Sequence, residues 1–182
     1  MRISSADQGM GCQAVYRVLG VLNGDLNYYT QESELDIDAV LTGSAALAIH
    51  ADMNGEQYET DTKDVDLYIN DMEGLETFRR LPLAERTRGD GAQYHYDTSS
   101  ASTAVRTPEA FVDIITDYES AFGWEHEDAR KVEQQLTVDM KGEPVMEGPV
   151  DIHLPELDTL RNTFQYSGRD YSQRIQLIDE MM

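Results

Sequence analysis

The chain has 182 residues, and its composition excludes several classes of protein. Aspartate and glutamate outnumber lysine and arginine by 35 to 14, and the resulting net charge of −21 argues against ordinary nucleic-acid binding. No apolar run has the length of a membrane span and the first residues lack a secretory pattern, so we expect a cytoplasmic protein with no membrane partner. The single cysteine, Cys12, excludes an intramolecular disulfide.

The acidic residues are spread along the whole chain instead of forming a tail. Apolar residues recur too regularly for a disordered protein. In molar salt the screening length falls to about 3 Å, so the mutual repulsion of these charges becomes weak. We therefore expect a halophilic protein, in which overall acidity is a weaker argument against nucleic-acid binding than it is at low salt.

Hydrophobic spacing predicts a first helix over residues 7–22, which ends at Asn23 and Gly24 and is followed by a loop over 27–34. The next elements are a strand over 37–41 and a helix over 44–51. Alternating and helical patterns then predict further elements. In order, these are a strand over 64–69, a helix from 71 that stops at Pro82, a hairpin of 92–96 with 101–106, a strand over 111–115, a helix within 117–132, a hairpin of 135–140 with 145–154, and helices over 155–165 and 169–181.

This order of elements predicts an α/β (α+β) fold with a mixed β-sheet flanked by helices. Hairpins dominate the second half, which argues against a doubly wound parallel sheet. We expect a single domain over residues 1–182. It comprises an N-terminal helical extension (1–34), a catalytic α/β core (35–154) and a C-terminal helical pair (155–182).

The first candidate binding feature is the pair Gly43–Ser44, where a strand gives way to a helix. A helix start carries backbone N–H groups without helical partners and the positive end of the helix dipole, which together favour a phosphate. The alternative is a simple strand-to-helix turn in which Ser44 caps the helix.

Acidic residues on two predicted strands form the second feature. Asp64 and Asp66 lie two residues apart on one strand, so both carboxylates point to the same face of the sheet. Adjacent anions repel unless a cation lies between them or one is protonated. Asp113 lies in an apolar strand, where a buried acid needs a partner or a metal. If the two strands are neighbours, the three acids can hold one or two Mg²⁺ ions; the alternative is that they are surface acids of a very acidic protein.

Together, Gly43–Ser44, the segment 64–66 and the segment 112–114 resemble the three-part signature of the DNA polymerase β-like nucleotidyltransferase superfamily. The segment 62–67 is closer still to the small toxin-type, abortive-infection-like members and to the antibiotic-resistance-type members. The C-terminal segment from Leu154 is similar to the ending of this family. The resemblance covers about residues 35–182.

The resemblance implies a nucleotidyltransferase fold and an enzyme that moves NMP from an NTP to a hydroxyl acceptor, with Mg²⁺ as cofactor at a two-metal site. The implied acceptor is RNA such as tRNA, a protein or a small molecule. Relatives of this size are commonly toxins of toxin–antitoxin pairs, so a cognate antitoxin is a further implied partner. The resemblance also implies a role for each residue of the motifs: Gly43 and Ser44 bind the nucleotide phosphates, Asp64 and Asp66 ligate Mg²⁺, and Asp113 completes the second metal site and activates the attacking hydroxyl.

The family ending further implies that Arg161 and Arg169 approach the triphosphate. Two positions depart from the family pattern. Thr60 stands where toxin-type relatives often have arginine, and Arg161 stands where they have lysine, which preserves the charge but changes the geometry. The missing arginine at position 60 and the high acidity of the chain favour the second hypothesis, a catalytically inactive nucleotidyltransferase-fold module that binds a nucleotide or a partner, or has a structural role.

Overall fold

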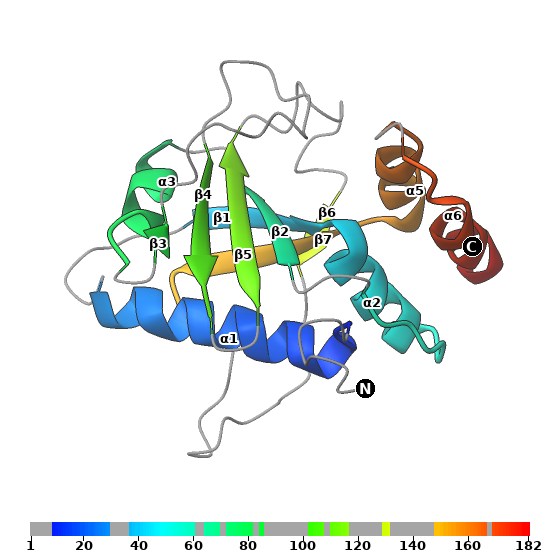
Figure 1. The fold of residues 1–182 in the computed structure, drawn as a ribbon, viewed down its shortest axis with the longest axis horizontal. Helices are drawn as coiled ribbons and strands as arrows, with labels where there is room; N and C mark the ends of the chain where they lie inside the picture. Colours follow the sequence, from blue (N-terminus) through cyan, green and yellow to red (C-terminus); the bar gives the residue numbers. More distant parts are fainter. Residues whose placement is uncertain are drawn as a thin grey trace, which may run out of the picture.

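The fold was obtained as a computed structural model. It describes residues 9–29, 37–60, 64–69, 72–81, 84–85, 102–107, 110–116, 129–131, 148–166 and 169–182. These residues form a seven-stranded sheet with five helices (Figure 1). The helices are α1 (Cys12–Tyr29), α2 (Gly43–Met53), α3 (Met72–Phe78), α5 (Leu157–Tyr166) and α6 (Ser172–Met181). The strands are β1 (Ile37–Thr42), β2 (Asp64–Ile69), β3 (Ala84–Glu85), β4 (Ser102–Arg106), β5 (Phe111–Thr116), β6 (Ala129–Lys131) and β7 (Val150–Pro155).

The sheet is mixed, with the strand order β3-β4-β5-β2-β1-β7-β6. In its centre β1 runs antiparallel to β2 and parallel to β7, and β2 runs parallel to β5. The outer pairs β3–β4, β4–β5 and β6–β7 are antiparallel. The predicted α/β class with a mixed sheet is therefore confirmed.

One face of the central sheet is apolar and the other carries polar side chains. On β1, Ile37, Ala39 and Leu41 are fully buried, and they alternate with Asp38, which is exposed. The same alternation on β2, β5 and β7 places one apolar set on a single face. That set belongs to a hydrophobic cluster with side chains of α1, α2 and α3, and Figure 1 shows α1 running alongside the sheet. The acidic residues of β2 and β5 lie on the opposite face.

The C-terminal helices form a pair next to α2. Helix α5 packs against α6, and both contact α2 (Figure 1). His50 at the end of α2 joins this region to the sheet, because its Nε2 lies 2.7 Å from the carbonyl oxygen of Pro155 at the end of β7. None of the helices within the described ranges combines the length and the apolar character that crossing a membrane requires.

The first helix is longer than the sequence pattern predicts. The expected end at Asn23 and Gly24 and the expected loop from residue 27 are wrong, because α1 continues to Tyr29. Leu26 is fully buried in the added turns. The side chain of Asn23 donates to the carbonyl oxygen of Val150 (3.1 Å) and accepts from its N–H (3.2 Å). Contacts with β7 thus satisfy a side chain that in isolation favours a helix end.

Most other predicted elements are confirmed with small differences. Strand 64–69 has the predicted bounds, while β1, α2 and β5 extend the predicted elements by one to three residues. The helix predicted within 117–132 is wrong at its end, since residues 129–131 form β6 and pair with β7. The predicted strand 92–96, most of that helix and the first strand of the second hairpin lie outside the described residues.

Candidate metal centre

Three carboxylates converge on the polar face of the sheet. Asp66 lies directly opposite Asp113 in the parallel β2–β5 pair, and Asp64 lies two residues earlier on the same face. One oxygen from each of Asp64, Asp66 and Asp113 lies within 4.8 Å of the others, and all three residues are partly buried. The expected convergence is confirmed, and the three acids are close enough to hold a metal ion.

The turn at the start of α2 lies against this cluster. Gly43 has a φ of 65°, a left-handed conformation that favours glycine. A Cβ atom built on Gly43 would lie 2.7 Å from Oδ2 of Asp66, so any other residue at this position would require this carboxylate to move. Ser44, in the first turn of α2, is buried. The predicted Gly43–Ser44 turn and the acidic cluster therefore form one site.

The donor set fits a hard divalent cation. Carboxylate oxygens are the ligands that Mg²⁺ and Ca²⁺ prefer, and no sulfur or imidazole is part of the cluster. The Oδ1 atom of Asp64 is buried and has no hydrogen-bond partner among the described residues. A buried carboxylate oxygen without a partner is unfavourable. A metal ion would supply the missing interaction.

The electrostatics of the cluster show the repulsion between its members. Burial, and then the charges of Asp64 and Asp113, raise the pKa of Asp66 to about 7, while Arg174 and Arg169 act in the opposite direction. Burial, and then the charge of Asp64, also raises the pKa of Asp113. Near neutral pH the metal-free cluster therefore retains a proton that a divalent cation would displace.

Two guanidinium groups from the C-terminal region act on the cluster. Arg169 precedes α6, and Arg174 lies on α6. The Arg174 guanidinium lies 4.4 Å from the ring centroid of Tyr171 and 5.3 Å from that of Phe164, so two aromatic rings hold it in place. Arg169 was predicted from the sequence as a site residue, whereas Arg174 was not. The signal was its spacing of three residues from Tyr171, which places both on one side of a helix.

Arg161 has a different partner. Its Nε donates to Oδ1 of Asp179 at 2.6 Å, which links α5 to α6. The hydrogen bond to Asp179 raises the pKa of Arg161, with burial acting weakly against it. Arg161 is not among the cations that lower the pKa of Asp66, and its predicted contact with a triphosphate stays a prediction.

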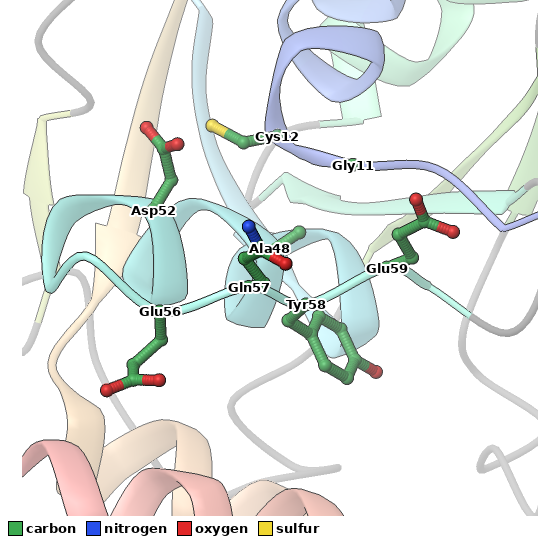
Figure 2. A pocket seen from close by; sticks show the side chains of 8 residues that line it. All are labelled: Gly11, Cys12, Ala48, Asp52, Glu56, Gln57, Tyr58 and Glu59. Atoms are coloured by element: carbon green, nitrogen blue, oxygen red, sulfur yellow. The ribbon is translucent and has the colours of Figure 1, made fainter.

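A separate hollow lies between the start of α1 and the segment after α2 (Figure 2). It contains none of the three clustered acids, and its lining includes Cys12, Asp52, Glu56 and Glu59. Burial, and then the nearby Asp52, raise the pKa of the Cys12 thiol to about 12, so it stays protonated and is a poor nucleophile. This hollow is therefore not the candidate site.

Comparisons with known proteins do not identify a family. Neither the protein-family models nor the curated proteins contain a match to this chain. The function must therefore be argued from the site.

Proposed function

We propose that this protein is a Mg²⁺-dependent nucleotidyltransferase that moves NMP from an NTP to a hydroxyl acceptor. The observation that carries the proposal is the single site in which three carboxylates face a glycine turn at a helix start. Carboxylates suit divalent cations, and the N-terminus of a helix suits phosphate. Together, these features match the two charged components of a metal–nucleotide complex.

In the proposed site, Asp64, Asp66 and Asp113 would hold the Mg²⁺. Bound Mg²⁺ neutralises negative charge on the phosphate that is transferred. The acceptor oxygen forms a bond to the α-phosphorus, the bond from that phosphorus to the β-phosphate oxygen breaks, and pyrophosphate leaves. Asp113 accepts the proton of the acceptor hydroxyl.

The remaining residues of the site bind and orient the triphosphate. Backbone N–H groups at Gly43 and Ser44 have no helical partners because they lie in the first turn of α2. They donate to phosphate oxygens. Arg169 and Arg174 supply further positive charge, and their lowering effect on the pKa of Asp66 supports this role. Guanidinium groups bind phosphate with paired hydrogen bonds.

The acceptor is proposed by class only. The first candidate acceptor is a tRNA hydroxyl, as expected for a toxin that a cognate antitoxin controls. A hydroxyl of a protein or of a small molecule is the second candidate. The net charge of −21 repels RNA at low salt, so the assay is run in molar KCl, where screening is strong.

The test is incubation of the protein with α-labelled NTPs, Mg²⁺ and each acceptor class. We expect label transfer that Asp64→Ala plus Asp66→Ala abolishes. Asp38→Asn is the matched control. It removes a carboxylate from the neighbouring strand, but this carboxylate pairs with His153 and is not part of the acidic cluster. Nucleotide binding without transfer would support the inactive binding module, and the absence of both Mg²⁺ and nucleotide binding would refute the proposed function.

A further inference from the structure

The strand position next to Asp66 carries a buried hydroxyl with no hydrogen-bond partner in the described ranges. Thr42, the last residue of β1, has 3% of its surface exposed. Its Oγ1 atom is buried and makes no hydrogen bond within the described part of the chain. A buried hydroxyl without a partner destabilises a folded protein, so its presence needs a reason.

The obvious local partner is not used. Thr42 is the N-cap residue of α2, with an extended backbone (φ −136°, ψ −172°). Threonine at this position ordinarily accepts a hydrogen bond from a backbone N–H in the first helical turn. Here the side chain makes no such bond. The helix start therefore does not account for the hydroxyl.

The sheet register places the Thr42 side chain next to the acidic cluster. Thr42 lies directly opposite Asp66 in the antiparallel β1–β2 pair, and Asp113 lies opposite Asp66 on the other side. Side chains at directly opposed positions lie on the same face, with Cβ atoms about 5 Å apart. Thr42, Asp66 and Asp113 thus form a row across three strands, and Thr42 borders the cluster on the side of α2.

We infer that Thr42 is a positioning residue of the metal centre, whose hydroxyl hydrogen-bonds a water molecule of the bound divalent cation. Mg²⁺ in proteins usually keeps several water ligands, which need hydrogen-bond partners around the site. The hydroxyl has no partner among the residues that the structure describes, and it would gain one when the cation binds. This inference rests on the proposed metal site. It means that the Thr42 hydroxyl lowers the stability of the metal-free protein but strengthens the binding of the cation.

The test compares Thr42→Val, which replaces the hydroxyl with a methyl group of similar size, with Thr42→Ser, which preserves the hydroxyl. Thr60→Val is the matched control, because Thr60 is equally buried but its Oγ1 accepts a hydrogen bond from the Met10 N–H (2.9 Å). The readouts are the melting temperature in EDTA and the affinity for Mg²⁺ alone by titration calorimetry.

We expect metal-free Thr42→Val to melt at or above the wild-type temperature but to bind Mg²⁺ about 3- to 10-fold more weakly, the range for loss of one hydrogen bond. Thr42→Ser should bind Mg²⁺ within about 2-fold of wild type, because the hydrogen bond is preserved. Thr60→Val should melt at a lower temperature with unchanged Mg²⁺ affinity.

Two results would overturn the inference while leaving the proposed function intact. In the first, Thr42→Val binds Mg²⁺ as tightly as wild type. In the second, Thr42→Ser binds it as weakly as Thr42→Val, which would assign the effect to packing. A wild-type protein that binds no Mg²⁺ would instead overturn both the inference and the metal-dependent function.

Discussion

Replacing Asp66 with asparagine should change how the stability of the metal-free protein depends on pH. The pKa of Asp66 is raised from 3.8 to about 7, chiefly by burial and then by Asp64 and Asp113. Between these two values the folded state holds a proton that the unfolded state has lost. The Asp66 contribution to the free energy of unfolding therefore falls as the pH rises from about 4 to about 7, and it is constant above that.

The size of the effect follows from the shift. Each pH unit within this window changes the free energy of unfolding by about 1.4 kcal/mol, so the wild-type protein loses about 3 kcal/mol between pH 5 and pH 7 through Asp66. Asparagine has a similar shape and does not titrate. We therefore expect Asp66→Asn to gain about 3 kcal/mol relative to wild type over this range.

The assay is urea unfolding in EDTA and high salt from pH 5 to pH 8, for wild type, Asp66→Asn and the control Asp38→Asn. Acids remote from the cluster titrate alike in wild type and Asp66→Asn and cancel in that comparison, whereas Asp64 and Asp113 lose the repulsion of Asp66 and contribute to the measured difference. The control Asp38→Asn reports the effect of removing a carboxylate outside the cluster. If the difference between Asp66→Asn and wild type stays constant with pH, the reasoning about the cluster is refuted.

Magnesium provides the second half of the test. At pH 8 and a Mg²⁺ concentration of about 100 times the dissociation constant, wild type should gain about 2.7 kcal/mol of stability, because the ion binds only the folded state. Asp66→Asn should gain far less, having lost one ligand. Equal stabilisation of both proteins would place the bound Mg²⁺ elsewhere.

Three further predictions concern the turn, the arginines and the charge. Gly43→Ala should cost about 2 kcal/mol in urea unfolding through its positive φ. It should also weaken Mg²⁺ binding, measured by calorimetry, because the added methyl group crowds Asp66. The control Gly55→Ala, at a glycine with a φ of 78° and open space around it, should lower stability without changing Mg²⁺ affinity. Equal Mg²⁺ affinity in both variants would contradict this. Arg174→Gln should raise the KM for NTP about 10-fold in the transfer assay, since hydrogen bonds to charged groups are strong. Arg161→Gln should leave that KM unchanged, because Arg161 pairs with Asp179. The reverse pattern would indicate that Arg161, and not Arg174, binds the triphosphate. The melting temperature should rise as KCl is raised to molar concentrations, because screening weakens repulsion within a chain of net charge −21. A melting temperature that does not depend on KCl would contradict the expected salt adaptation.

The local patterns that survived in the structure are those that tertiary contacts reinforce. Strand β2 has the predicted bounds because its alternating side chains match a sheet with one apolar face. The predicted end of α1 was wrong. Asn23 and Gly24 favour a helix end locally, but hydrogen bonds between Asn23 and β7, more than a hundred residues away along the chain, stabilise the continued helix. Such a contact leaves no trace in the local pattern.

By itself, the sequence determined the local chemistry of the site: a glycine–serine turn, two acids on one face of a strand and a third acid in an apolar strand. These features depend only on residue type and on the periodicity of strands. The tertiary structure alone decided which strands are neighbours, and therefore that Asp66 lies between Thr42 and Asp113. It also decided that Arg174 of α6 lies near enough to lower the pKa of Asp66. Strand order and helix docking depend on contacts between distant segments, which no short stretch of sequence encodes.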